Sequence, residues 1–202
     1  MSSEPMRDPT TDHLLTPQNS ALIIIDYQPL QVSSVASLDR RELVLNIAAV
    51  TRLAKLFRLP IVLSTVNVKA KGNEPTIHQL RELLPNTPEI DRTTINSWED
   101  QEFLKAVKAT GRKKLIMTAL WTEACLSFPA LDALKDGYDV YMVVDAVGGT
   151  SARAHDAALR RLEQAGAKPI SWAQMACELQ RDWARADTAA AFGGILFAVE
   201  GR

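Results

Sequence analysis

The stretch that decides the fold reads Leu115-Ile116-Met117-Thr118-Ala119-Leu120, followed by Trp121-Thr122-Glu123-Ala124-Cys125 and by a segment that runs to Gly137. The first part is a short run of apolar and small residues, which is typical of a buried strand. The rest carries apolar residues at helical spacing up to Gly137. We therefore predict a buried strand, a tight turn and a helix that holds Cys125 in its first turn.

Several signals agree on this helix. Thr122 is suited to cap the first free amides, Glu123 suits the positive end of the helix, and Gly137 suits a left-handed stop. A thiol near the helix start faces unpaired amides, which favour the thiolate and predict a lowered pKa for Cys125. Pro129 cannot donate to the carbonyl of Cys125, so we expect the helix to bend or loosen just after it. A second interpretation, that Cys125 is an ordinary buried small residue, is equally open from this stretch alone.

The rest of the chain alternates strands and helices. Strands are predicted at 21–25, 60–66, 139–146 and 168–171, with a short edge strand within 89–98; helices are predicted at 40–58, 76–84, 99–110, 151–166 and 173–185. This order predicts an α/β fold, a three-layer α/β/α sandwich around a central, mainly parallel Rossmann-like sheet. Such sheets bind ligands at the carboxyl ends of their strands. Asp26 and Cys125 both follow strands, which favours a functional role for Cys125.

The composition limits the partners. The chain has 202 residues, 47% of them hydrophobic, and a net charge of −1, which gives no reason to expect nucleic acid or an anionic membrane as partner. Its longest apolar runs are far shorter than the roughly 20 residues that span a bilayer. Two cysteines and a polar start without a secretory signal predict a cytoplasmic protein. We expect a flexible lead-in at 1–18, one domain at 19–185 and a tail at 186–202.

Asp26, Arg92 and Cys125 together resemble the triad of the isochorismatase-like cysteine hydrolases, over roughly Leu15 to Trp183. Several separated segments are similar to the YcaC-type bacterial members of that superfamily: Thr87-Pro88-Glu89-Ile90-Asp91-Arg92, Ile95-Asn96-Ser97-Trp98, 103–111, Phe128-Pro129-Ala130-Leu131 and 177–183. Most of the superfamily has Lys where this chain has Arg92. The other interpretation of Arg92 is a surface charge paired with Asp91 or Glu89.

The resemblance implies a role for each of these residues. Cys125 would be the nucleophile and Asp26 the general base, while Arg92, which stays charged, would act electrostatically. The amides of Trp121 and Cys125 would form an oxyanion hole after a cis peptide at Leu120-Trp121. The implied substrate pocket contains Asn96, Trp98, Trp121 and Phe128, although packing is the default role of the aromatic residues.

No cofactor or metal is expected. Nicotinamidases of the superfamily hold a metal with an aspartate and nearby histidines, whereas His13, His78 and His155 lie far apart in this sequence, without ligand spacing. We interpret His155 as a surface or capping residue and Cys177 as a core residue.

Together these features predict a cysteine hydrolase that cleaves the C–N (amide) bond of a small molecule through a thioester. Two alternatives stay open: a vinyl-ether hydrolase of the isochorismatase type, and a non-catalytic, thiol-bearing oligomeric binding or redox protein. The substrate depends on loops 27–38 and 67–88 and stays unidentified. YcaC-type proteins are octamers, so the resemblance implies a homo-oligomer, with an octamer favoured. Apolar residues near the C-terminus fit this assembly: Trp172, Met175, Leu179, Trp183, Phe192, Ile195, Leu196, Phe197 and Val199.

Overall fold

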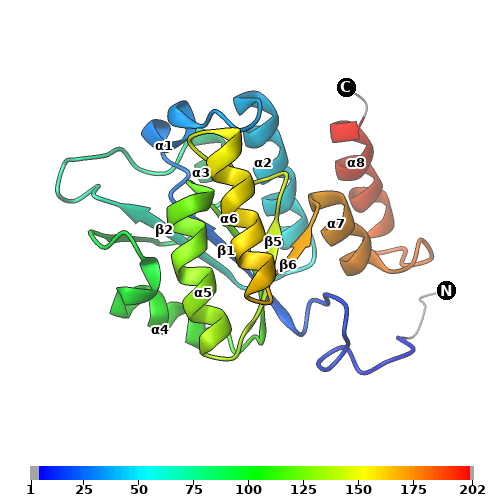
Figure 1. The fold of residues 1–202 in the computed structure, drawn as a ribbon. Coiled ribbons are helices and arrows are strands. Elements are labelled where there is room, and N and C mark those ends of the chain that lie inside the picture. The colour runs from blue at the N-terminus through cyan, green and yellow to red at the C-terminus, as the bar shows by residue number, and fades with distance from the viewer. Residues whose placement is uncertain (1–4, 201–202) are drawn as a thin grey trace.

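The computed structural model describes residues 5–200, and the side chains of residues 5–198. Within that range the chain forms one parallel six-stranded sheet in the order β3-β2-β1-β4-β5-β6 (Figure 1). Its strands are β1 (Ser20–Ile25), β2 (Ile61–Val66), β3 (Glu89–Arg92), β4 (Lys114–Ala119), β5 (Asp139–Val143) and β6 (Lys168–Ile170). The predicted parallel α/β fold is confirmed.

Helices cover both faces of this sheet. They are α1 (Pro29–Ser34), α2 (Arg40–Leu56), α3 (His78–Leu83), α4 (Gln101–Ala109), α5 (Ser127–Lys135), α6 (Ala152–Gln164), α7 (Trp172–Gln180) and α8 (Ala189–Glu200). Apolar residues of α2, α3, α7 and α8 share one hydrophobic core, and those of α4, α5 and α6 share the other. Figure 1 shows α5 and α6 lying across one face of the sheet. The two cores give the predicted three layers.

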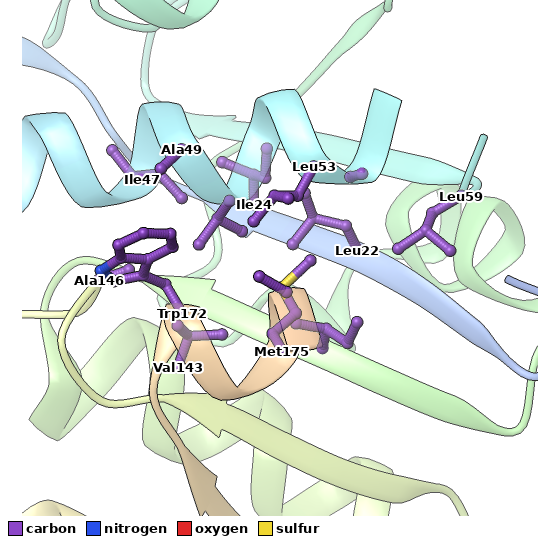
Figure 2. Close-up of a cluster of buried hydrophobic side chains, with 14 of the residues drawn as sticks. Leu22, Ile24, Ile47, Ala49, Leu53, Leu59, Val143, Ala146, Trp172 and Met175 are labelled. Atoms are coloured by element: carbon purple, nitrogen blue, oxygen red, sulfur yellow. The ribbon is translucent and has the colours of Figure 1, made fainter. Parts of the chain in front are cut away.

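Strand β1 shows why the predicted strands are apolar without alternation. Leu22 and Ile24 belong to the core under α2 and α7, and Figure 2 shows them beside Ile47 and Leu53 of α2. The intervening residues Ala21, Ile23 and Ile25 belong to the opposite core. Because side chains alternate between the two faces of a strand, a central strand of a covered parallel sheet must be apolar at every position.

The lead-in is more ordered than we expected. The buried Nζ of Lys114 donates to the backbone carbonyls of Asp12, His13 and Leu14 at 2.7, 2.7 and 3.0 Å. The amide of the fully buried Leu15 donates to Glu178 at 2.7 Å. These residues are therefore packed against the body of the domain, because a buried ammonium needs these carbonyls as partners. Residues 1–4 lie outside the described residues.

The C-terminal tail contains a helix that we did not predict. Helix α8 packs against α2 and α7, and its Phe192 is buried in the first core. Its sequence, rich in Ala and Gly, lacks the polar face that marks a surface helix, so no amphipathic period was visible. Val199 lies outside the residues whose side chains are described. No helix in the described range is long and apolar enough to cross a membrane.

Candidate active site

The sheet topology brings Asp26, Arg92 and Cys125 to one edge. Asp26 directly follows β1, Arg92 is the last residue of β3, and Cys125 lies just beyond β4. Strand β1 pairs with β2 on one side and with β4 on the other, and all these pairs are parallel. All three residues therefore lie at the carboxyl edge of the sheet. At Asp26 the chain leaves the strand with a positive φ of 61°.

Asp26 and Arg92 form a completely buried ion pair. Arg92 Nη1 donates to Asp26 Oδ1 at 2.9 Å, and Nη2 donates to Oδ2 at 2.8 Å. The remaining N–H groups of these two nitrogens donate to the carbonyls of Thr65 and Ile95. Both side chains are inaccessible to solvent. Such a two-point contact fixes the orientation of the carboxylate as well as its charge.

The alternative interpretation of Arg92 as a surface charge is wrong. Glu89 pairs with Arg81 instead, at 2.9 Å. The carboxylate of Asp91 accepts from the amides of Val68 and Lys69, both at 2.9 Å, and so shapes the loop after β2.

Cys125 lies in a widened turn between β4 and α5. Thr122–Leu126 is π-helical, and the regular helix α5 begins only at Ser127. The helix is thus loosened at Cys125 itself, rather than after it, and Pro129 sits in the first turn of α5, where its missing N–H is tolerated. Gly137 has a positive φ of 83° and ends the helix as expected.

The predicted cap at Thr122 is not formed. The residue before the π-helical turn is Trp121, without a side-chain cap, and the Thr122 hydroxyl instead contacts Nδ1 of His155 at 2.8 Å. Glu123 accepts from the amide and hydroxyl of Thr150, at 2.9 and 2.6 Å. Both side chains therefore bind the neighbouring segment rather than their own helix.

Cys125 has close polar neighbours. Asp26, Arg92 and the backbone amide of Trp121 are the groups close enough to shift the pKa of its thiol. The Leu120-Trp121 peptide is cis, as the resemblance implied. Cys125 is 9% exposed whereas Asp26 is fully buried, so a substrate would reach the thiol first.

The ionisation of Cys125 is opposite to our prediction. Burial, and next the negative charge of Asp26, raise the pKa of the Cys125 thiol to about 12, and Arg92 and the Trp121 amide offset this only partly. Burial also raises the pKa of Asp26 above its usual range, against the effect of Arg92. One cation faces two acidic groups, so a thiolate beside an ionised Asp26 would leave an uncompensated buried charge. These electrostatics favour the thiol form of Cys125 at rest.

Two of the four predicted pocket residues have structural roles. Asn96 donates to Asp132 at 2.7 Å and accepts from the amide of Trp98 at 3.0 Å. Trp98 packs in the second core, and its Nε1 donates to Asp136 at the far end of α5 from Cys125. These contacts hold both side chains in the fold, and their role in a substrate pocket stays a prediction.

Trp121 and Phe128 remain near the thiol. The indole of Trp121 is half-buried and donates to Ser34 of α1 at 2.8 Å. Phe128 follows Cys125 by one turn and is 37% exposed. Their role in a pocket stays a prediction.

The structure adds His155, which we had interpreted as a surface or capping residue. It is half-buried in the first turn of α6, and burial lowers its pKa. Its position after the Gly148-Gly149 turn, at the carboxyl end of β5, was the available signal, because that edge of the sheet holds the candidate site. Cys177, which we had assigned to the core, is exposed on α7.

The described residues contain no group of three His, Cys, Asp or Glu side chains that could hold a metal ion. His13 and His78 are exposed and lie beside Asp12 and Glu82, respectively. The absence of a catalytic metal stays a prediction.

Comparisons with known proteins agree with this geometry. Residues 20–174 match the model of the isochorismatase domain. The chain is 40% identical over 170 residues to the Escherichia coli protein named "Probable hydrolase YcaC", covering 84% of this chain and 81% of that protein. The structure of YcaC from Pseudomonas aeruginosa, with hexane-2,5-diol and covalent acrylamide, superimposes with a TM-score of 0.86 at 36% identity, covering 95% of this chain and 96% of that one.

A second YcaC structure, from Escherichia coli, is described as an octameric hydrolase of unknown specificity. It superimposes with a TM-score of 0.86 at 35% identity, covering 98% of this chain and 92% of that one. A nicotinamidase from Bacillus subtilis matches with a TM-score of 0.63 at 17% identity, covering 76% of this chain and 100% of that one, and so shows a shared fold alone.

Proposed function

This chain belongs to the isochorismatase family of hydrolases, and we propose that within it the protein cleaves the C–N bond of a small, uncharged amide through a thioester on Cys125. The observation that carries the proposal is that Cys125 lies at the same carboxyl edge of the sheet as the buried Asp26–Arg92 pair, with Asp26 and the Trp121 amide near enough to act on its thiol. A nucleophile, a base and an oxyanion donor thus meet at one largely buried thiol.

The first half of the reaction forms the thioester. As the sulfur attacks the amide carbon, its proton passes to Asp26, and the carbonyl oxygen becomes an oxyanion that the Trp121 and Cys125 amides stabilise. Asp26 then gives this proton to the nitrogen, and the C–N bond breaks to release ammonia or an amine. The raised pKa of Asp26 supports the proposal, because it makes the protonated carboxyl group more accessible as the acid that returns the proton to the nitrogen.

The second half restores the enzyme. Asp26 accepts a proton from a water molecule, whose oxygen attacks the thioester carbon. The C–S bond breaks, the carboxylic acid leaves, and the proton returns to the sulfur. Arg92 transfers no proton in either half, since its guanidinium stays charged. Its role in the proposal is to hold the Asp26 carboxylate in one orientation toward the sulfur.

The charges at the site support an uncharged substrate. Arg92 directs its terminal nitrogens to Asp26 and to two backbone carbonyls, and its Nε, which has no partner among the described residues, is buried, so the guanidinium presents no accessible N–H to a substrate carboxylate. Acrylamide, which is covalently bound in the Pseudomonas aeruginosa YcaC structure, is itself a small uncharged amide. Because a nucleophile adds to the alkene of acrylamide and leaves its C–N bond intact, we take that adduct as support only for the size and charge of the ligand.

The alternatives are less well supported. A redox role requires a reactive thiolate, whereas the raised pKa of Cys125 keeps it a thiol. Vinyl-ether hydrolysis needs no cysteine nucleophile, so it leaves the contact between Cys125 and Asp26 unexplained.

We further propose that the protein is a homo-oligomer, with an octamer favoured. Trp183 and Phe197 are 60% and 62% exposed and stack on each other with ring centroids 6.3 Å apart. An exposed pair of stacked aromatic rings is typical of an interface. The Escherichia coli YcaC structure is described as octameric.

The proposed reaction is tested by ammonia release from a panel of small uncharged primary amides. We expect release by the wild-type protein and by the Cys177→Ser variant, and none by Cys125→Ala. Intact mass spectrometry after rapid acid quenching should show the acyl group on the wild-type protein only. Equal release by Cys125→Ala, or no release from any amide in the panel, would overturn the proposal.

A further inference from the structure

The proposed oxyanion donors lie in the turn 121–126, and this turn hydrogen-bonds to the segment 148–155 that follows β5. The amide of Thr122, next to Trp121, donates to the carbonyl of Gly148 at 2.9 Å. Its carbonyl accepts from the hydroxyl of Ser127 at 2.7 Å. Thr122 is fully buried, so its side chain has no access to water.

The hydroxyl of Thr122 has one recorded partner, Nδ1 of His155, at 2.8 Å. His155 lies in the first turn of α6, and its own amide donates to the carbonyl of Ser151 at 3.0 Å. The backbone of His155 is therefore fixed in α6, and its imidazole ring contacts Thr122 in the turn. A buried hydroxyl that loses its partner costs free energy, so this bond restricts where Thr122 can lie.

Glu123, the next residue, also joins the turn to the segment before α6. Its Oε1 accepts from the amide and the hydroxyl of Thr150 at 2.9 and 2.6 Å. A Cβ added to Gly149 would lie 2.5 Å from Glu123 Oε2 and 3.1 Å from the Cβ of His155. A side chain at position 149 would therefore displace the Glu123 carboxylate and press on His155, so the turn and the start of α6 are closely packed.

From these contacts we propose that His155, acting through the hydroxyl of Thr122, is a positioning residue that holds the amides of Trp121 and Cys125 where the oxyanion forms. The inference rests on the proposed acyl chemistry at Cys125. Neither His155 nor Thr122 touches the sulfur in this role. Small displacements of oxyanion donors reduce rates strongly, because the donors act at one position in the transition state.

The inference separates two reactions of the same thiol. Acylation by p-nitrophenyl acetate passes through an oxyanion, whereas alkylation by iodoacetamide displaces iodide and forms none. A residue that positions the oxyanion donors should therefore affect the first reaction and spare the second. A residue that only maintains the fold should affect both.

The experiment uses the full-length protein with Cys177→Ser in every variant, so that only Cys125 reacts. We expect Thr122→Val and His155→Leu each to lower the maximal acylation rate about 10- to 100-fold. The ester concentration at half-saturation and the alkylation rate should stay within about twofold. Thr122→Ser keeps the hydroxyl and His155→Asn keeps a polar group near the place of Nδ1, so both should recover most of the rate.

The double variant Thr122→Val/His155→Leu should be no slower than the slower single variant, because both changes remove one contact. The inference would be overturned if the double variant lost acylation rate by the product of the two single losses. It would also be overturned if alkylation slowed as much as acylation, or if Thr122→Ser and His155→Asn did not recover the acylation rate. A wild-type protein that is alkylated but not acylated would also overturn it. Normal ester acylation without ammonia release from any amide would instead contradict only the proposed C–N cleavage.

Discussion

Arg92 reaches across β2 to bind Asp26 at both carboxylate oxygens, with N–O distances of 2.9 and 2.8 Å, and the pair is closed to solvent. The strand it crosses contributes the carbonyl of Thr65 as a further acceptor. Asp26, the proposed base, is therefore held by the side chain of Arg92, which extends from the edge strand β3. This arrangement makes the pair part of the fold as well as part of the site.

Removing Arg92 should destabilise the protein. Arg92→Met leaves a carboxylate buried without its partner, and we expect the free energy of unfolding to fall by about 3–5 kcal/mol, measured by urea denaturation. Asp26→Asn/Arg92→Met, which removes both charges, should be less affected than Arg92→Met. Asp26→Asn alone leaves a buried guanidinium unpaired, so its loss of activity must be measured together with stability. A change below about 1 kcal/mol for Arg92→Met would contradict the buried pair.

The two cysteines should differ in function. Cys125→Ala is expected to lower amide hydrolysis at least about 1000-fold, while Cys177→Ser leaves it unchanged. Steady-state ammonia release gives both values. Because Cys177 is exposed, it can react with iodoacetamide before Cys125, so alkylation identifies the nucleophile only when Cys177 is absent. Activity that survives Cys125→Ala would remove it as the nucleophile.

The dependence of kcat/KM on pH should have an acidic limb and no alkaline limb in the accessible range. Activity requires ionised Asp26, so it should fall as the pH drops through the raised pKa of this group. The thiol pKa of about 12 keeps the proton on Cys125 up to high pH. Accordingly, Cys177→Ser should develop no thiolate absorbance below about pH 10. A thiolate at neutral pH would show that the buried charges are arranged differently.

Assembly should depend on the exposed aromatic pair. We expect Trp183→Ser/Phe197→Ser to shift sedimentation at micromolar concentration toward smaller species, with a Met6→Ser variant as the control for an exposed residue elsewhere. Deleting residues 186–202 is a weaker test, since it also uncovers the core that Phe192 fills. A wild-type protein that sediments as one species near 22.3 kDa would contradict the oligomer.

Metal chelators should not affect the reaction. Sequence spacing gave no histidine pair suited to a metal, and the described residues contain no group of three potential ligands. We therefore expect equal ammonia release before and after treatment with EDTA. Stoichiometric zinc or iron in freshly purified protein, lost together with activity, would contradict this prediction.

Local chemistry in the sequence was enough for the framework of the fold. One apolar run ends at Asp26 and another ends before Trp121, and segments with helical spacing lie between them. This pattern predicts parallel strands whose carboxyl ends lie at one edge of the sheet. Because Asp26 and Cys125 each follow one of these strands, chain order alone places them at the same edge of the sheet. Arg92 was different, because only the resemblance, and no local pattern, distinguished it from other charges of its loop.

Directions and electrostatics needed the tertiary structure. Asn96 and Trp98 donate to Asp132 and Asp136, and Cys177 is exposed, because the contacts of a side chain depend on distant elements. The Cys125 pKa rises where the helix start alone predicted a fall. The helix effect is local and visible in sequence, whereas burial and the nearby Asp26 charge exist only once separate strands have assembled.

The sequence by itself thus determined the parallel α/β fold and two of the three residues at its candidate site, because apolar periodicity and chain order suffice for both. Tertiary structure alone decided that Arg92 closes a buried pair with Asp26, that the resting nucleophile is a thiol, and that His155 bonds to Thr122. These features depend on distances between segments far apart in the chain, which no local pattern records.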